Sequence, residues 1–597
     1  MCGIIGAVSE TAIQPVLDGL GKLEYRGYDS SGISLLCNDE IQTIKAQGKL
    51  SNLKQRLSQQ ALDGECCIGH TRWATHGRAS VTNAHPHQCG QVSVVHNGII
   101  ENYLQLKHQL MQWGHHFSSS TDSEVIPHLI NHYLSQHHSE EEAIEKAISQ
   151  LKGSYAIGVL INSSNKNLYA VKQGSPLVIS QGNNGAYMAS DAMALGNDSD
   201  KIYYPKDNEL VKLNSDDITL CNQTSKKIHY ISNNQCSKAI SKGEHSSFME
   251  KEIFEQVDLL KRLSVNNNAN EFASIDFNGL NKITIIACGT SYYAASVAKS
   301  WFEQYANILV EVDIASEYRY RSPIVSEKEL TIFVSQSGET ADTLAALRYA
   351  NAKKSQTLAL VNVVNSSIAR ESNYTFEIYA GPEIGVASTK AFSCQLAIFY
   401  KMAVEAAKQR TTLDSATLSE LTQNFVQLPY LIEKVLQRCP EMKLMANKLS
   451  QFSNALFLGR GALTAIAQEG ALKLKEISYI HAEAYAAGEL KHGPIALLDN
   501  KMPVLVIAPK NSLTDKLVSN IKEVQARNAP IFIIGDKSNQ EYFDLKAGEF
   551  FELPQMPESI LPIISVIPMQ LLALYSAQAL GRNVDQPRNL AKSVTVE

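Results

Sequence analysis

The apolar positions of the chain fall into short runs and longer helical stretches. Residues 2–8, Cys-Gly-Ile-Ile-Gly-Ala-Val, form a continuous apolar run with the length of a buried strand. Residues 248–256 begin a helix after a polar stretch at 231–247, which predicts a hinge. Residues 560–580 carry no charge and have the length of a membrane span, but two prolines and several serine and glutamine residues interrupt them. We therefore expect a buried core helix there.

Three strand-like runs recur further along the chain, which indicates an internal repeat. By first residue, the paired runs start at 282 and 454, at 331 and 503, and at 361 and 531, so the offsets are 172, 172 and 170. Chance similarity between α/β units is the alternative interpretation. The near-constant offset favours two duplicated α/β domains with parallel sheets.

Length and composition describe a multidomain globular chain. Its 597 residues exceed what one hydrophobic core holds, and 44% apolar and 19% charged residues are ordinary values. The net charge of -6 provides no basic footprint, so we expect no nucleic-acid partner. Ten cysteines without a Cys-x-x-Cys pair fit a reducing compartment, and no basic and apolar leader is present. We expect a cytoplasmic protein without a signal peptide or membrane span.

The second residue is the first candidate for chemistry. If Met1 is removed, Cys2 carries a thiol and a free α-amine on one residue. A thiolate is a strong nucleophile, and an α-amine with a pKa of about 8 can serve as the neighbouring base. The alternative is a small buried cysteine at the start of a strand.

Three loops in the first third carry further polar candidates. Arg72 lies in the run Gly-His-Thr-Arg-Trp-Ala-Thr-His-Gly, where a guanidinium binds a carboxylate or forms a structural salt bridge. Asn97-Gly98 between apolar residues is a hairpin signal, and alternatively its amide and backbone N–H form an oxyanion hole. Asp122 precedes a helical run, so it is either an N-cap or a ligand for an ammonium group.

Four histidines in the same region, His70, His76, His85 and His87, raise the question of a metal site. Zinc sites usually show tighter Cys and His pairs at regular spacing. We therefore favour structural or substrate-orienting roles and expect no metal.

Together these motifs resemble the N-terminal-nucleophile (Ntn) glutamine amidotransferases. The motifs are Cys2-Gly-Ile, Tyr25-Arg-Gly-Tyr-Asp-Ser, Gly69 to Gly77, Asn83-Ala-His-Pro-His, His96-Asn-Gly-Ile-Ile-Glu-Asn and Thr121-Asp-Ser-Glu. The resemblance implies a four-layer α/β/β/α glutaminase that splits glutamine into glutamate and ammonia, with Cys2 as nucleophile and its α-amine as base. It assigns the oxyanion hole to Asn97 and Gly98, the α-carboxylate ligand to Arg72, the α-ammonium ligand to Asp122, and the pocket lining to Trp73, Thr75 and His76, with Trp73 as a gate.

The repeated part contributes two groups of candidates. Residues 331–340, Thr-Ile-Phe-Val-Ser-Gln-Ser-Gly-Glu-Thr, place hydroxyls between a strand and a helix start, where they suit a phosphate or serve as ordinary caps. The second copy lacks this loop, so we expect one phosphate site per chain. Glu469, Lys473 and Glu476 form one helical stripe at i, i+4 and i+7 beside an uncharged packing stripe. An exposed Glu–Lys ladder is the alternative.

Two residues near the end of the chain complete the candidates. His492 lies in a glycine-bounded loop, where a functional role competes with that of a solvated histidine. The tail at residues 585–597 shows no helical periodicity and reads as a frayed end. However, Lys592 can form a Schiff base with a keto sugar if the tail folds over a site.

The second part resembles the isomerase half of the glutamine–fructose-6-phosphate aminotransferase (isomerizing) family, which has two sugar isomerase (SIS) domains. The motifs are Cys288-Gly-Thr-Ser, Ser335-Gln-Ser-Gly-Glu-Thr, Val386-Ala-Ser-Thr-Lys, Glu476-Ile-Ser-Tyr-Ile-His-Ala-Glu, Gly488-Glu-Leu-Lys-His-Gly-Pro and the tail from Asp585. Two positions near the hinge depart from the expected pattern. Val257 stands in place of a proline, and Ser247 stands in place of an aromatic residue or histidine.

This resemblance implies roles for individual residues. Lys592 forms a Schiff base with the sugar, Glu476 moves a proton between C1 and C2 with Lys473 beside it, and His492 assists ring opening at the site of a neighbouring subunit. The sugar phosphate is held by Ser291, Ser335, Gln336, Ser337 and Thr340, with Ser388 near the sugar hydroxyls.

The two resemblances predict the organisation and the reaction. The fold class is α/β multidomain: an Ntn glutaminase at 2–230, a linker at 231–247, SIS domains with parallel sheets at 248–430 and 431–581, and a catalytic tail at 582–597. We expect L-glutamine and fructose 6-phosphate as substrates, glucosamine 6-phosphate as product, an internal ammonia channel and a homodimer. Such proton transfers need no metal or organic cofactor. The rival interpretations are a phosphoribosyl-transferring amidotransferase and a non-catalytic sugar-phosphate sensor.

Overall fold

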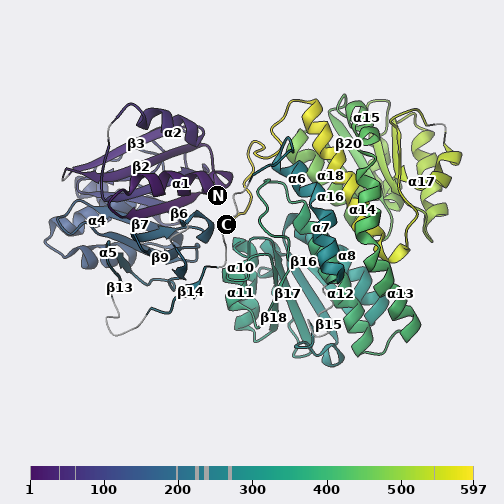
Figure 1. The fold of residues 1–597 in the computed structure, drawn as a ribbon, viewed down its shortest axis with the longest axis horizontal. Helices are drawn as coiled ribbons and strands as arrows, with labels where there is room; N and C mark the ends of the chain where they lie inside the picture. Colours follow the sequence, from purple (N-terminus) through teal and green to yellow (C-terminus); the bar gives the residue numbers. More distant parts are fainter. Residues whose placement is uncertain are drawn as a thin grey trace. The chain divides into compact units, whose positions relative to one another are not determined.

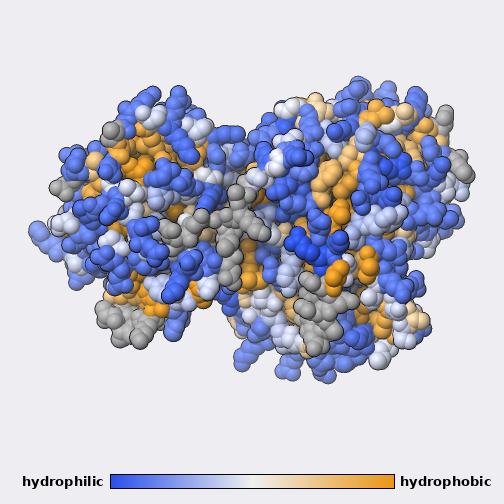
Figure 2. Space-filling view, viewed as in Figure 1, coloured by the Kyte–Doolittle hydropathy of each residue, from blue (hydrophilic) through white to orange (hydrophobic). Residues whose placement is uncertain are grey.

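The computed structural model describes residues 2–38, 40–60, 62–196, 199–221, 228–233, 241–265, 272–543 and 545–595. The chain divides into two compact units, Met1–Ile240 with Ser593–Glu597 and Ser241–Lys592. Hydrophilic residues cover most of the visible face of each unit, and apolar residues form smaller patches (Figure 2). The two units are described separately below.

The first unit contains two sheets whose described neighbouring strands are all antiparallel (Figure 1). In spatial order, one sheet has β14 (Ile231–Ser232), β11 (Lys201–Tyr203), β9 (Val178–Gly182), β10 (Gly185–Ala189), β1 (Gly3–Val8), β4 (Cys66–Arg72), β2 (Ser30–Cys37) and β3 (Glu40–Gln47). The other has β13 (Ile218–Leu220), β12 (Val211–Leu213), β8 (Leu168–Gln173), β7 (Gly153–Ile161), β6 (Val92–Ile100) and β5 (His87–Cys89). The helices are α1 (Ile13–Leu23), α2 (Leu50–Leu57), α3 (Tyr103–Gln112), α4 (Val125–Ser135) and α5 (Glu140–Ile148).

Alternating side chains of β1 show how the layers are held together. Ile4 and Val8 belong to the apolar cluster that also contains Val95 of β6, so they pack between the two sheets. Ile5 and Ala7 point to the opposite face, into a cluster with residues of α1 and α2. A strand with both faces buried reads as one continuous apolar run, and this explains why residues 2–8 predicted it. The result is the expected α/β/β/α arrangement.

The second unit contains two five-stranded parallel sheets with the same topology (Figure 1). Their spatial orders are β16 (Leu309–Ile314), β15 (Lys282–Ala287), β17 (Glu329–Ser335), β18 (Gln356–Val361), β19 (Tyr374–Glu377), and β21 (His481–Ala486), β20 (Asn454–Gly459), β22 (Val504–Ala508), β23 (Ile531–Gly535), β24 (Phe550–Glu552). In each sheet the first strand in sequence lies between the second and the third, so the duplication predicted from the sequence is confirmed.

One of the three repeated strands was misplaced in the sequence analysis. The run beginning at Val361 was predicted as a strand, but β18 ends at that residue. The chain leaves the sheet at Asn362, whose side-chain amide donates to the Gly381 carbonyl at 2.7 Å. The preceding segment Gln356–Val361 is the buried strand that corresponds to β23.

Helices cover both sheets of the second unit and join them into one core. They are α6 (Phe248–Phe254), α7 (Gln256–Val265), α8 (Gly289–Trp301), α9 (Ala315–Tyr318), α10 (Ala341–Ala352), α11 (Ser367–Glu371), α12 (Lys390–Gln409), α13 (Ser415–Val426), α14 (Leu428–Leu436), α15 (Cys439–Leu449), α16 (Leu463–Ser478), α17 (Thr514–Gln525) and α18 (Leu561–Ala579). The predicted helix start at Phe248 is confirmed, because the Ser247 hydroxyl caps α6 by accepting the Glu250 N–H at 3.1 Å.

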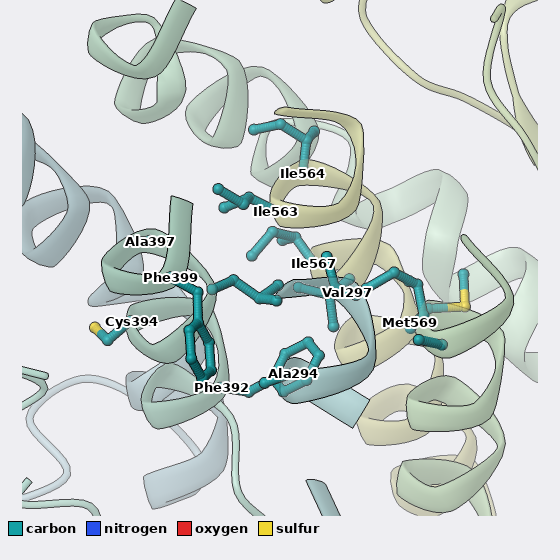
Figure 3. Packing of buried hydrophobic residues seen from close by; sticks show 14 of the residues in the cluster. Ala294, Val297, Phe392, Cys394, Ala397, Phe399, Ile563, Ile564, Ile567 and Met569 are labelled. Carbon is teal, nitrogen blue, oxygen red and sulfur yellow. The ribbon is translucent and has the colours of Figure 1, made fainter. Parts of the chain in front are cut away.

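The helix α18 is the centre of this core. Figure 3 shows Ile563, Ile567 and Met569 of α18 packed among side chains of α8 and α12. By length and composition the segment Glu558–Ala579 is apolar enough to cross a membrane, but its most apolar window is entirely buried inside the protein. The sequence prediction of a buried core helix is therefore confirmed for this segment.

Candidate functional site

Cys2 lies immediately before β1 and is held by two backbone groups. Gly3 pairs with Thr71 in the β1–β4 ladder, so Cys2 lies next to the end of β4. Its sulfur accepts the backbone N–H of Trp73 at 3.2 Å, and its carbonyl accepts the Asn97 amide N–H at 3.0 Å. Burial raises the pKa of the Cys2 thiol, while the Trp73 N–H and the Arg72 guanidinium oppose this shift. Met1 lies outside the described residues.

The pair Asn97-Gly98 lies inside β6 rather than at a turn, so the hairpin interpretation is wrong. The two residues pair with Ala156 and Tyr155 of β7. Gly98 has φ of 131°, and the Cβ of any other residue there would lie 1.9 Å from the Ser154 carbonyl oxygen. The position therefore requires glycine.

The buried His70 fixes the orientation of the Asn97 amide. Its Nε2 lies 3.0 Å from both the His96 carbonyl oxygen and Asn97 Oδ1. Both of these atoms accept hydrogen bonds, so Nε2 carries the proton, and the amide nitrogen of Asn97 is left to face Cys2. Burial lowers the pKa of His70 to about 3, so this ring is neutral at physiological pH.

Arg72 supports the loop that follows β4. Its guanidinium donates to the carbonyl oxygens of Gly77 at 3.0 Å and Arg78 at 3.4 Å, and also to that of His76. The loop returns past Trp73, whose ring lies edge-on to Tyr28 at 6.0 Å. In this loop Thr75 is exposed and His76 is half-buried.

Asp122 does not cap the helix that follows it. The helix α4 begins at Val125 with Glu124 in the N-cap position, so the capping interpretation is wrong. The Asp122 carboxylate instead accepts the Ile100 backbone N–H at 2.8 Å, at the end of β6. The strand that carries Asn97 and Gly98 therefore also positions Asp122.

The hydroxyl-rich loop of the second unit lies between β17 and α10. Strands β15 and β17 pair in parallel with Ala287 opposite Val334, so both end at the same edge of the sheet. The strands β16 and β17 lie on opposite sides of β15, so the chain switches direction here. Ligands of open α/β sheets bind at such a switch point.

Hydrogen bonds fold this loop into a compact turn. The Ser335 hydroxyl accepts the Gly338 N–H at 3.0 Å and lies 2.9 Å from the Thr340 hydroxyl. The Ser337 hydroxyl accepts the Glu339 N–H at 3.2 Å, and the Gln336 carbonyl accepts the Asn362 N–H. Ser291 lies in the first turn of α8 at the same edge, and its hydroxyl accepts from the Gln395 amide at 3.0 Å.

Lys592 is buried in the second unit. Its ammonium is ion-paired with the Glu383 carboxylate and donates to the Gly385 carbonyl at 2.8 Å. The two paired side chains are 4% and 0% exposed. The Ser388 hydroxyl donates to the same carboxylate at 3.3 Å, so Ser388 and Lys592 share one partner. The interpretation of the tail as a frayed end is wrong for this residue.

The carboxylates around Lys592 have opposite pKa shifts. Burial disfavours the charged form of Glu383, but Lys592 and the N–H groups of Ala391 and Thr389 outweigh it and lower the pKa of Glu383. Burial, together with the charge of Glu383, raises the pKa of neighbouring Glu252 to about 7. Glu383 was missed in the sequence analysis, although its place in a Gly- and Pro-bounded loop just before Ser388 was a usable signal.

The charged stripe of α16 is buried at Glu469 and Lys473 and half-buried at Glu476, so the exposed-ladder interpretation is wrong. Lys473 Nζ lies 2.5 Å from Glu476 Oε2 and 3.6 Å from Glu469 Oε1, and both Lys473 and Glu469 are at most 1% exposed. Thr290 links this group to the first of the two repeated α/β domains by donating to Glu469 at 3.2 Å and accepting from Lys473 at 3.1 Å. Burial raises the pKa of Glu469 to about 8.

The uncharged stripe of α16 packs against α18, so the prediction that this stripe is a packing face is confirmed. Ile466, Leu474 and Ile477 are fully buried, and a Cβ on Gly470 would lie 2.8 Å from the sulfur of Met569. His492, in contrast, is exposed at the end of the 3₁₀ turn Ala487–His492. The structure therefore does not bring His492 into the buried group around Lys592.

Two family models match the chain. Residues 70–197 match a glutamine amidotransferase domain, and residues 277–405 and 448–579 each match an SIS domain. The second and third ranges contain the two parallel sheets with identical topology.

Similar proteins match over the whole chain. A glutamine–fructose-6-phosphate aminotransferase (isomerizing) of Brucella suis biovar 1 (strain 1330) is 45% identical over 607 residues, and that of Bartonella quintana (strain Toulouse) is 44% identical, with both chains covered completely in each case. Among solved structures, the C-terminal domain of glucosamine-fructose-6-phosphate aminotransferase from Francisella tularensis is 41% identical with a TM-score of 0.55, covering 58% of this chain and 100% of that one. The chain belongs to the family of glutamine–fructose-6-phosphate aminotransferases (isomerizing).

Proposed function

We propose that this chain converts glutamine and fructose 6-phosphate into glutamate and glucosamine 6-phosphate, with Cys2 and Lys592 as its two covalent catalysts. The observation that carries the proposal is the position of Lys592. A lysine on an irregular tail is normally solvated, yet this one is buried beside Glu383 and Ser388. A lysine held in a buried position beside a carboxylate is suited to forming an imine with a ketone.

Glutamine hydrolysis takes place in the first unit. The Cys2 thiolate attacks the side-chain amide carbon of glutamine, and its α-amine accepts the thiol proton and passes it to the departing ammonia. The Gly98 N–H and the second N–H of the Asn97 amide stabilise the oxyanion, and losing one such donor costs about 3–4 kcal/mol. Water then cleaves the thioester and releases glutamate.

The protein recognises glutamine through its α-carboxylate and its α-ammonium group. We assign the α-carboxylate of glutamine to Arg72 and its α-ammonium group to Asp122, because each pairs with the opposite charge. Trp73, Thr75 and His76 lie on the loop after β4 and line the glutamine pocket. Trp73 follows Arg72 directly and donates its backbone N–H to the Cys2 sulfur, so movement of this loop changes the hydrogen bonding of the nucleophile.

Sugar conversion takes place in the second unit. The phosphate is held at the N-terminal ends of α8 and α10 by Ser291, Ser335, Gln336, Ser337 and Thr340. Lys592 condenses with the C2 ketone of the open-chain sugar and water leaves, and ammonia delivered inside the protein then replaces the lysine at C2. Glu476 removes a proton from C1 and returns it to C2, with the Lys473 ammonium 2.5 Å from its carboxylate.

Ring opening requires an acid that Lys592 does not supply. We assign it to His492 of a second copy in a homodimer, since His492 is exposed and therefore accessible to a partner. The cytoplasmic location stays a prediction from composition.

The proposal is tested by measuring glucosamine 6-phosphate with either glutamine or ammonia as nitrogen source. Cys2→Ala should abolish product formation from glutamine and leave formation from ammonia. Cys37→Ala, which alters another half-buried cysteine, should leave both. Borohydride added with fructose 6-phosphate should label Lys592. Unchanged turnover of glutamine in Cys2→Ala, or a label on another residue, would contradict the assignments.

A further inference from the structure

Three potential metal ligands meet on the first unit, and none of them is a residue assigned to glutamine. Cys89 is the last residue of β5, His115 follows α3, and His128 lies in α4. His128 Nδ1 is 3.3 Å from the Cys89 sulfur and 3.0 Å from His115 Nδ1. All three ligand atoms lie within 4.8 Å of one another.

These separations match those of ligands around one zinc ion. Zinc–sulfur and zinc–nitrogen bonds of about 2.3 and 2.05 Å in a tetrahedron give edges of about 3.6 Å between S and N and about 3.3 Å between two N atoms. The observed 3.3 Å and 3.0 Å are each about 0.3 Å shorter. Side-chain rotations that lengthen these two separations, and that keep Cys89 and His115 within the 4.8 Å they already share, admit the ion.

Hydrogen bonding alone satisfies this cluster poorly. In a neutral imidazole each ring nitrogen either carries one proton or offers one lone pair. His128 Nδ1 faces both the Cys89 sulfur and His115 Nδ1, so the Cys89 thiol and the His115 ring compete for a hydrogen bond to one ring nitrogen. A cation accepts the lone pairs of all three atoms at once.

The remaining nitrogens of both histidines face polar partners. His128 Nε2 lies 3.9 Å from the Glu124 carboxylate, and His115 Nε2 lies 3.4 Å from His132 Nδ1. Glu124 is the kind of outer partner that orients a zinc-binding histidine. His132 Nε2 accepts from the Gln136 amide at 2.9 Å, so His132 carries its proton on Nδ1, and His115 has to change its tautomer when its own Nδ1 binds the ion. The His128 ring also stacks on Phe117 with a centroid distance of 4.3 Å, so its orientation is set before any ion binds.

We propose that Cys89, His115 and His128 bind one zinc ion through the thiolate and the two Nδ1 atoms, with water as the fourth ligand. Cys89 and His115 are half-buried and His128 is buried, which leaves an open side for the ion and for water. A thiolate with two imidazoles selects zinc and similar transition metals over magnesium and calcium, which prefer oxygen ligands.

The site is coupled to the loop that carries Asp122. Glu124 accepts hydrogen bonds from the N–H and hydroxyl groups of Ser118 and Ser119, at 2.7 to 2.8 Å. The same carboxylate faces His128, so the zinc ion and the Asp122 loop share Glu124 as a common support. Zinc binding should therefore order the segment between α3 and α4.

Sequence spacing concealed these ligands. They are 26 and 13 residues apart (115 minus 89 and 128 minus 115) and belong to three elements. The sequence analysis expected no metal because it considered His70, His76, His85 and His87. The fold of the unit supplies the proximity that the spacing lacks.

The test is titration of the full chain with cobalt(II) and zinc(II) alone. A Cys2→Ala background removes the other residue at which a thiol lies beside an amine. We expect one equivalent of cobalt with a thiolate-to-cobalt absorption band, displaced by zinc. Cys89→Ser should abolish the band, and His115→Gln should weaken zinc binding more than about 100-fold, since losing even an outer partner costs roughly 10–100-fold.

Two matched variants control for general effects. His108→Gln changes an exposed histidine on α3, and Cys37→Ser changes another half-buried cysteine, so both should bind like the parent. Replacing the buried His128 could disturb folding, so the variants to compare are Cys89→Ser and His115→Gln at half-buried positions. Circular dichroism checks that both are folded. Absence of the band in the parent, or equal binding by the parent and the Cys89→Ser or His115→Gln variant, would overturn the proposal.

Discussion

The ion pair between Glu383 and Lys592 should determine whether the tail stays packed against the loop that carries Glu383. In Glu383→Gln the carboxamide keeps the shape and the oxygen that accepts from Thr389 and Ala391 at 2.9 and 3.0 Å. The negative charge facing Lys592 is lost. Because both side chains are buried, removing one partner of such a pair costs about 3–5 kcal/mol.

This cost should appear as opening of the tail. At about 1.4 kcal/mol per tenfold change, it corresponds to roughly two to three and a half orders of magnitude in opening. Amide hydrogen exchange of residues 585–592 measures this directly, since their protection includes the hydrogen bond from Arg588 N–H to the Tyr479 hydroxyl at 2.7 Å. Labelling of Lys592 by borohydride should fall in parallel, while glutamine hydrolysis should not change.

The matched control is Glu371→Gln, which removes a carboxylate paired with Arg348 on the surface. The side chains of that pair are 34% and 41% exposed, so its loss should cost only about 0–1 kcal/mol and leave the tail protected. If Glu383→Gln exchanged no faster than Glu371→Gln, the tail would not depend on this ion pair, and the account of Lys592 would be wrong.

Two further changes probe the first unit. Gly98→Ala places a Cβ 1.9 Å from the Ser154 carbonyl oxygen at φ of 131°, so it should destabilise the unit by about 2–5 kcal/mol and abolish glutamine hydrolysis. The control is Gly196→Ala, which has open space around it and should do neither. Equal thermal stability of the two variants would refute the strain argument. Burial lowers the pKa of His70 to about 3, against about 6.5 in the unfolded state. Between these two values the unfolded state binds a proton at His70 and the folded state does not, so the free energy of unfolding falls as the pH drops, by up to about 1.4 kcal/mol per pH unit. The free energy of unfolding, measured with urea between pH 4 and 7, should therefore depend less steeply on pH in His70→Asn than in the parent. An equally steep pH dependence in both would contradict the assignment.

Continuous apolar runs made much of the fold predictable. Residues 3–8, 282–287 and 454–459 are strands buried on both faces, and such strands leave largely apolar runs in the sequence. The C-terminal end of β18 was harder to predict, because Val361-Asn-Val-Val also reads as apolar. The strand ends at Val361 only because the chain turns at Asn362. Local patterns identify elements better than their ends.

The site was predictable where the residues stand in compact motifs. Glu469, Lys473 and Glu476 follow from helical spacing, but their burial depends on packing against α8 and α18, which no local pattern contains. The loop around Glu383 was a usable signal, but its pairing with Lys592, like the contact of Thr290 with Lys473, follows only from the fold. The same holds for the three proposed zinc ligands, since long-range proximity is a property of topology.

The most direct test of the account follows the nitrogen atom. The full chain is incubated with fructose 6-phosphate and glutamine carrying ¹⁵N in its side-chain amide, in the presence of unlabelled ammonium. The account predicts that the amino group of glucosamine 6-phosphate carries ¹⁵N, and that Cys2→Ala makes only unlabelled product. Release of ¹⁵N-ammonia with glutamate but no labelled amino sugar would contradict the central claim.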